Sequence, residues 1–88
     1  MMVMKAAALC DAGKHCGAEA NAAKYLAGEA GFDASQQAIM THGGFGYAKE
    51  YHVERYWREA RLMKIAPVSQ EMVLNFISSK TLGLPKSY

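Results

Sequence analysis

A glycine-rich turn at residues 40–47, with the sequence MTHGGFGY, is the part of the chain best suited to contact a ligand. Because glycine has no Cβ, Gly43, Gly44 and Gly46 can end a helix and leave main-chain N–H groups open to a phosphate oxygen. The turn has neither a Walker lysine nor a preceding strand, so it is neither a P-loop nor a Rossmann fingerprint. On its own, such a pattern is usually a helix C-cap. We expect His42 to hydrogen-bond the last helix carbonyls, with contact to a phosphate or a substrate carbonyl as the alternative.

The cysteines are the other candidates for chemistry. A metal site would use Cys10, His15 and Cys16, but this spacing matches no common zinc pattern and a fourth ligand is missing. We therefore expect no metal and two reduced cysteines that serve as small apolar residues. The sequence pairs no nucleophile with a base, so the residues alone indicate no reaction.

Composition sets broad limits on function. A chain of 88 residues forms one small domain that buries roughly 60 to 65% of its unfolded surface. Hydrophobic residues make up 51% and charged residues 20%, and the net charge of +2 is too small to indicate nucleic-acid binding. No apolar run approaches the ~18 residues of a membrane span, and residues 1–5 lack the features of a signal peptide. We expect a soluble intracellular protein, in the bacterial cytoplasm or the mitochondrial matrix.

The segment from Met1 to about Ala12 is predicted to be a helix that is apolar on nearly every side. Such a helix should be buried on more than one face. A small isolated domain has few elements to cover it. We therefore expect residues 1–88 to be one helical domain, incomplete at its N-terminus and cut from something larger.

A long helix is predicted from about residue 18 to about residue 42. Tyr25, Phe32 and Ile39 recur every seven residues and should fill the space between helices. The two glycines inside this helix each cost ~1 kcal/mol relative to alanine, so tertiary packing must hold it. A ridge with a period of four, which we expect in the core, comprises Ala18, Ala22, Leu26, Ala30, Ala34 and Ala38.

A charged amphipathic helix is predicted from Glu50 to about Met63. Glu54 with Arg58 and Arg55 with Glu59 stand four apart, and each pair would add ~0.2 to 0.5 kcal/mol. Such a density of charge indicates a solvated face, with a subunit contact as the alternative. The expected buried face comprises Val53, Tyr56, Trp57 and Ala60.

The last helix should follow a break at Pro67. Ser69 can cap its first turn, Glu71 opposes the positive end of its dipole, and residues 83–85 (GLP) are typical of a helix stop. No stretch alternates with period two. We therefore predict an all-α fold of four helices that form part of an up-and-down bundle. The expected buried side of the last helix comprises Met72, Val73, Phe76 and Ile77.

Short sequence blocks along the whole chain also resemble a known family. They are Asp11-Ala12-Gly13, Glu19-Ala20-Asn21, Ala23-Lys24-Tyr25-Leu26, residues 41–47, Glu50-Tyr51, Val53-Glu54-Arg55, Trp57-Arg58-Glu59-Ala60, Leu82-Gly83-Leu84-Pro85 and Ser87-Tyr88. Together they look like the C-terminal helical domain of the acyl-CoA dehydrogenases. Full-length members of that family also have an N-terminal helical domain and a middle β-domain, which carry most of the flavin and acyl-CoA contacts.

The resemblance implies FAD-dependent α,β-dehydrogenation of an acyl-CoA thioester in fatty acid metabolism. A base removes the α-proton, the β-hydrogen passes as hydride to the flavin, and an electron-transferring flavoprotein reoxidises the flavin. We expect a homodimer or a homotetramer. We expect this chain alone to be inactive and to supply FAD contacts and part of the oligomer interface.

The family resemblance also implies cofactor contacts at the glycine turn. In the family this loop touches the FAD of the partner subunit near its adenosine diphosphate, and the matching positions are Met40, Gly43 and Gly44. Glutamine usually stands where this chain has Met40, so only the main-chain part of the contact is retained.

The segment before the last helix carries the remaining implied contacts. Ser69 and Glu71 match positions that meet FAD, and Val68 matches one that faces the substrate. Pro67 stands where the commonest subgroup has its catalytic glutamate, so we assign no catalytic residue here. The base then lies on an upstream helix, or dehydrogenation has been lost. Two alternatives remain: a noncatalytic helical self-association module, and a flavin oxidase of the same superfamily.

Overall fold

The structure is a computed structural model that describes residues 1–86, so the Ser87-Tyr88 block lies outside the described residues. The described residues form helices and no strand, which confirms the all-α prediction. The α-helices are α1 (Met2–Asp11), α2 (Gly17–His42), α3 (Val53–Leu62) and α4 (Gln70–Lys80), and two short 3₁₀ segments, η1 (Gly43–Tyr47) and η2 (Lys49–Tyr51), join α2 to α3.

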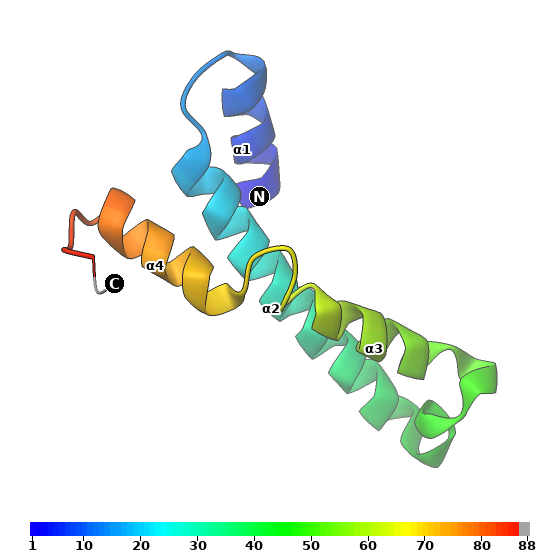
Figure 1. The fold of residues 1–88 in the computed structure, drawn as a ribbon. Coiled ribbons are helices and arrows are strands. Elements are labelled where there is room, and N and C mark those ends of the chain that lie inside the picture. Colours follow the sequence, from blue (N-terminus) through cyan, green and yellow to red (C-terminus); the bar gives the residue numbers. More distant parts are fainter. Residues whose placement is uncertain (87–88) are drawn as a thin grey trace.

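Helix α2 is the axis of the molecule (Figure 1). Helix α1 folds back on its N-terminal half, and α3 runs back along its C-terminal half. Helix α4 packs on the N-terminal half as well, because Gln70 reaches Tyr25 and the ring of Phe76 lies by Gly17. Among the described residues, α1, α3 and α4 pack on α2 and not on one another.

This arrangement is open. The radius of gyration is 16.2 Å, whereas a compact domain of this length would have about 12 Å. The accessible surface is 6496 Å², against roughly 5,100 Å² expected for a compact monomer of this mass. The α1–α2 hairpin and the α2–α3 hairpin therefore lie end to end along α2, and together with α4 they do not close into a bundle.

The apolar core is correspondingly small, and several of the sequence predictions about it were wrong. The buried hydrophobic residues are Ala6, Ala23, Val53 and Val73. The middle of the ridge along α2 faces outward: Leu26 is 52% exposed, and Ala30 and Ala34 are exposed too. On α2 the buried positions are instead Ala23, Gly28 and Ser35, because α1, α3 and α4 approach other sides of the helix.

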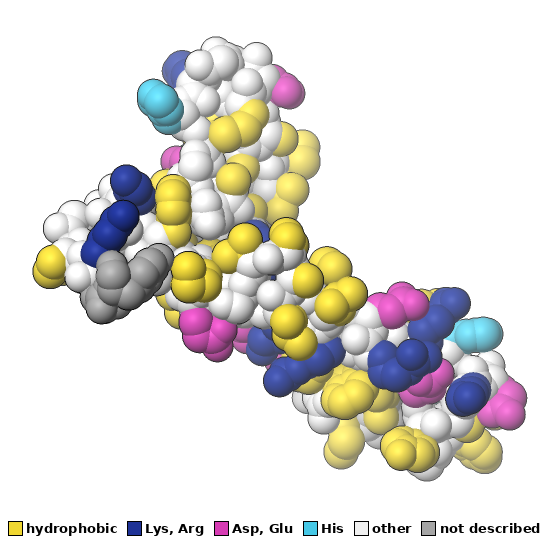
Figure 2. All heavy atoms as spheres, viewed as in Figure 1, with side chains coloured by type: hydrophobic (Ala, Val, Ile, Leu, Met, Phe, Trp, Pro, Cys, Tyr) yellow, Lys and Arg dark blue, Asp and Glu magenta, His cyan; other side chains and the backbone are white. Residues whose placement is uncertain are grey.

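Helix α1 was also expected to be covered on several faces, and it is not. Ala6 is its buried residue, while Met1, Val3 and Met4 are exposed. The physical reason is that α2 alone covers α1. Figure 2 shows the resulting hydrophobic surface along α1.

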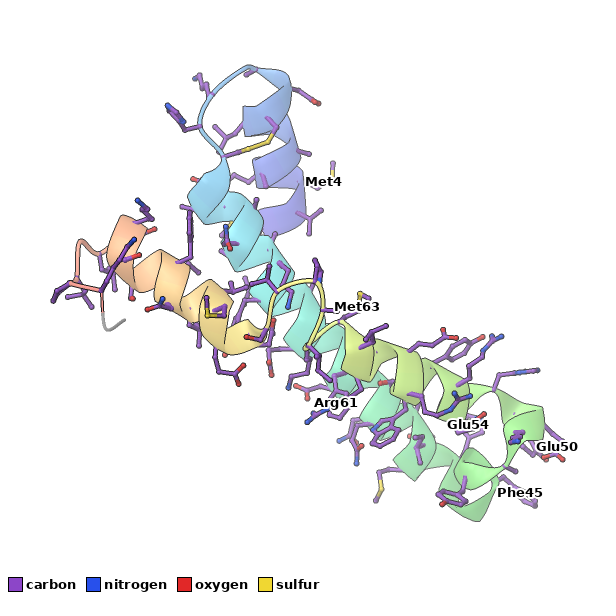
Figure 3. All side chains as sticks on the ribbon, in the orientation of Figure 1. Met4, Phe45, Glu50, Glu54, Arg61 and Met63 are labelled. Atoms are coloured by element: carbon purple, nitrogen blue, oxygen red, sulfur yellow. A yellow bond between two sulfur atoms is a disulfide. The ribbon has the colours of Figure 1, made fainter. Side chains whose placement is uncertain are left out.

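The predicted pair of reduced cysteines is wrong as well. Cys10, at the end of α1, and Cys16, at the start of α2, form a disulfide with S–S 2.06 Å and Cα–Cα 5.7 Å (Figure 3). The turn at Gly13, which has φ +70°, folds the chain back and brings the two ends within bridging distance.

Helix α3 starts later than predicted. His52 adopts a left-handed conformation with φ +62°, so regular helix begins at Val53 and not at Glu50. Glu54 and Arg58 form the predicted ion pair at 2.7 Å. Arg55 instead lies over the ring of Tyr56, which is 50% exposed and was wrongly assigned to the buried face.

Helix α4 follows most of its predicted pattern. The Ser69 side chain accepts a hydrogen bond from the main-chain N–H of Met72 at 3.3 Å, which confirms the N-cap. Val73 is 1% exposed, but Met72 is 46% exposed because that side of the helix faces away from α2. Helix α4 ends at Lys80 with Thr81 as its C-cap, so the helix stops before the predicted GLP stop, and Gly83, with φ +69°, turns the chain beyond it. Within residues 1–86 no helix is long and apolar enough to cross a membrane.

Candidate functional site

The glycine turn lies at the far end of the α2–α3 hairpin, where Figure 3 labels Phe45 and Glu50. The ring nitrogen Nδ1 of His42 lies 2.9 Å from the carbonyl oxygen of Ala38, which confirms its predicted role at the helix end. The His42 ring also meets Tyr51 edge-on at 6.0 Å between centroids, and Phe45 packs on Tyr51 at 5.3 Å. These contacts join the end of α2 and η1 to η2 across the turn.

The three glycines of the turn have different structural requirements. Gly43 has φ +62°, a conformation that glycine favours. Gly46 is buried, and a Cβ there would lie 2.5 Å from the carbonyl oxygen of Ile39. Gly44 has neither requirement, since its φ is not positive and a Cβ would meet nothing within 4 Å. The fold therefore explains Gly43 and Gly46 but leaves Gly44 free to serve a ligand.

Met40, Gly43 and Gly44 come together at this exposed end. Met40 is 66% exposed on the last turn of α2, and its carbonyl oxygen accepts the N–H of Gly43. The sequence-predicted cofactor residues of the turn thus form one accessible group.

An open groove of about 500 Å³ runs beside the turn, and sequence reasoning missed it. Its lining includes Trp57, whose indole N–H donates to Gln36 at 2.7 Å and whose ring centroid lies 5.9 Å from that of Phe32. Its rim carries the Glu54–Arg58 pair, and the hydrogen bond from Arg58 lowers the pKa of Glu54. Figure 2 shows Lys and Arg side chains gathered over α3 along this side. The full lining is Gln36, Ile39, Tyr47, Lys49, Glu54, Trp57 and Arg58.

Pro67, Val68, Ser69 and Glu71 form a second group at the start of α4. Val68 is 45% exposed, and Pro67 and Glu71 are exposed. Ser69 and Glu71 line a second groove of about 480 Å³. The rest of that lining is Tyr25, Glu29, Arg61, Lys64, Ile65, Gln70 and Leu74.

The structure does not bring the two groups together. The α4 group lies against α2 at the level of Glu29, and the glycine turn begins at Gly43. At 1.5 Å per residue, these positions are about 21 Å apart along the helix. In Figure 3 the labels of Arg61 and Met63, near the α4 connection, are likewise well separated from Phe45.

A polar network at the second groove is the main feature that sequence reasoning missed. Gln70 is 5% exposed, and its amide N–H₂ donates to the carbonyl oxygen of Tyr25 and to Glu29, both at 3.0 Å. Lys24 donates to the amide oxygen of Gln70 at 2.7 Å. Lys64 donates to Glu29 at 3.1 Å. The available signal was Gly28, a glycine inside a helix, which indicates a close approach at that point.

The neighbours of Glu29 favour the ionised form of its carboxyl group. The hydrogen bond from Gln70 and then that from Lys64 lower the pKa of Glu29, while partial desolvation opposes them. Lys64 and Arg61 also lie over the ring of Phe32, at 5.0 and 5.1 Å. Within residues 1–86, no cluster of three His, Cys, Asp or Glu side chains could hold a metal ion.

Comparison with known proteins identifies the family of this chain. The model of the acyl-CoA dehydrogenase C-terminal domain matches residues 1–82. The chain belongs to the acyl-CoA dehydrogenase family. It is therefore related to oxidoreductases, and it corresponds to the C-terminal domain of such enzymes.

Individual relatives agree. The chain is 51% identical over 90 residues to acyl-CoA dehydrogenase FadE12 of Mycobacterium tuberculosis, covering 100% of this chain and 23% of the relative. It is 39% identical over 82 residues to an acyl-CoA dehydrogenase of Bacillus subtilis, covering 93% and 22%. Over the same shares it is 37% identical to the caffeyl-CoA reductase–Etf complex subunit CarC of Acetobacterium woodii. No solved structure matches the chain.

The chain thus spans less than a quarter of the length of these three relatives. Its sequence-predicted site residues fall on two surfaces of one domain.

Proposed function

We propose that this chain is the C-terminal helical part of an FAD-dependent acyl-CoA dehydrogenase and contributes FAD contacts and an oligomer interface to it. When bound, FAD would supply the hydride acceptor for α,β-dehydrogenation of an acyl-CoA thioester. The chain's own part is to bind and orient. Family membership and the names of the relatives support this proposal.

The observation that carries the proposal is the bare main chain at Gly44. Gly44 is exposed in the turn beside Gly43, and no strain or close contact within the described residues requires its missing side chain, so its main chain is open to a ligand. Together with Met40 and Gly43, it offers an open backbone suited to the diphosphate end of FAD in a neighbouring subunit. The residues present therefore fit the expected group.

At the start of α4, we propose that Ser69 and Glu71 meet the FAD of the chain's own subunit and that Val68 meets the acyl group. The distance of about 21 Å between the two groups agrees with contacts to two separate FAD molecules. Pro67 has no proton-accepting side chain, so we propose that the base lies on an upstream helix of the parent enzyme. We also propose an electron-transferring flavoprotein as the acceptor, since one relative is named as part of an Etf complex.

The test is a chimera in which this chain replaces the matching C-terminal part of the mycobacterial relative. We expect the purified chimera to retain FAD, measured by flavin absorbance, and to oxidise an acyl-CoA with an artificial electron acceptor. Gly44→Ala should lower the FAD content, because the methyl group would occupy the space of the cofactor.

Gly31→Ala is the matched control. It also adds a methyl group to open space, but in the middle of α2. Its FAD content should equal that of the parent chimera. Equal FAD content in both variants would contradict the proposed contact at Gly44.

A noncatalytic helical association module is the second candidate, and Pro67 with the exposed Met40 favours it. Such a module would assemble with itself but bind no flavin. Sedimentation of the 88-residue chain with and without FAD, together with the flavin content of the chimera, separates the two. Self-association in a chimera that holds no flavin would support the second candidate.

A further inference from the structure

Gln70 is an unusual side chain for the first turn of a helix, because it is polar and 5% exposed. All of its amide hydrogen-bonding directions toward α2 are used: two donors reach Tyr25 and Glu29, and the acceptor receives Lys24. A buried amide is costly when it loses its partners. Gln70 is therefore held in one place and one orientation.

Helix α2 has a recess for this side chain. A Cβ on Gly28 would lie 3.1 Å from Nε2 of Gln70, which is closer than side chains usually approach, and 3.5 Å from its Cδ, which is an ordinary contact. The glycine therefore lets the amide reach the helix backbone. Gly31, one turn further, faces open space and has no such neighbour.

Glu29 ties down both ends of the connection between α3 and α4. Its Oε1 accepts from Gln70 at 3.0 Å, and its Oε2 accepts from Lys64 at 3.1 Å. The main-chain N–H of Gln70 also donates to the carbonyl oxygen of Lys64 at 3.2 Å. Residues 65–69 thus form a short loop whose two ends meet at a single carboxylate on α2.

We propose that Gln70 and Glu29 are positioning residues that fix loop 65–69 on α2 and so set where Val68 and Ser69 stand. This inference rests on the proposed function, in which Val68 meets the acyl group and Ser69 meets FAD. Gln70 and Glu29 act through the loop and touch neither ligand. The Gly28 recess fixes the depth at which Gln70 is seated.

The test uses Gln70→Met, which keeps the length of the side chain but removes all three hydrogen bonds. In the chimera with the mycobacterial relative, we expect KM for the acyl-CoA to rise about tenfold, because a displaced loop 65–69 moves Val68 away from the acyl group. The flavin absorption spectrum should also shift, because Ser69 moves. Glu29→Gln keeps an oxygen acceptor for Gln70, and its KM should rise less.

Val73→Ala is the matched control. Val73 is 1% exposed and holds α4 on α2, but it lies outside the loop clamp. This variant should lower Tm and leave KM and the flavin spectrum unchanged at temperatures where the protein is folded. If Gln70→Met alters KM and spectrum no more than Val73→Ala does, the positioning role is wrong.

A second readout needs no flavin and keeps the clamp testable if the chimera binds none. In the 88-residue chain, hydrogen exchange at the loop amides of Ile65 and Ala66, whose N–H groups donate to the carbonyl oxygen of Leu62, should speed up in Gln70→Met and Gly28→Ala. In Val73→Ala, exchange should speed up along α4 instead. Unchanged exchange of the loop amides in Gln70→Met would overturn the clamp, whereas loss of FAD binding by the unmutated chimera would overturn only the proposed function.

Discussion

The polar residues of this chain matter through the partners that the fold gives them. Glu29 is a clear case: on a helix face rich in alanine it has no special feature in the sequence, yet it accepts hydrogen bonds from Gln70 and Lys64. These two donors lower the pKa of its carboxyl group, so the ionised form favours the folded state.

This pKa shift predicts how stability depends on pH. The ordinary pKa is 4.5 and the folded value is lower, so the contribution is fully present above pH 4.5 and is lost as pH falls toward the folded pKa. We expect the free energy of unfolding of the chain, measured by urea titration at several pH values, to fall in that acid range. Glu29→Gln should flatten this decline.

Glu54 is the comparison for this experiment, because its pKa is lowered in the same direction by Arg58. The decline that remains in Glu29→Gln should flatten further in the double variant Glu29→Gln/Glu54→Gln. A pH profile of Glu29→Gln identical to that of the unmutated chain would show that the contacts of Glu29 do not form in solution.

At the scale of elements, each outer helix depends on α2 for its packing. Helix α1 has one buried residue, Ala6, whose side chain is a single methyl group. The disulfide between Cys10 and Cys16 joins its end directly to the start of α2. The disulfide therefore restrains the end of α1 beside α2, where buried apolar contact is small.

Reduction of this disulfide should destabilise the docking of α1. The cysteines are 6 positions apart, and closing so short a loop contributes about 2 kcal/mol in the chain-entropy description. We expect a reductant to lower the free energy of unfolding by about that amount, with the loss seen in helical circular dichroism. The double variant Cys10→Ser/Cys16→Ser should already show the lower stability and should not respond to reductant; a response there would assign the effect to something else.

At the scale of the whole molecule, the open shape leaves one long face of α2 without a cover. Ala30 and Ala34 are exposed, as is Leu26 at 52%. The same small residues that predicted a buried ridge are suited to close approach by another helix. We infer that this face packs against other parts of a larger assembly.

Paired substitutions on α2 test this inference. Ala30→Leu should change the stability of the 88-residue chain by less than about 0.5 kcal/mol, because the site is exposed. Ala23→Leu should destabilise the chain by about 1 to 3 kcal/mol, because Ala23 is 8% exposed. In the chimera, Ala30→Leu should lower the yield of assembled flavoprotein; an unchanged yield would mean that this face stays uncovered.

The sequence by itself determined the four helices, the Ser69 cap, the Glu54–Arg58 pair and the role of His42, because these depend on neighbours within a few positions. It also determined the family, because sequence blocks along the whole chain carry the resemblance.

Only the tertiary structure decided which face of each helix is covered. Periodicity groups Ala30 with Leu26, but burial depends on which helix arrives from elsewhere in the chain. In the same way, the disulfide and the left-handed His52 depend on how the connecting turns fold the chain back. The clamp of Gln70 on Gly28 and Glu29 joins distant parts of the chain, since Glu29 and Gln70 are 41 positions apart. No local pattern encodes such a meeting, because it exists only once α4 has docked on α2.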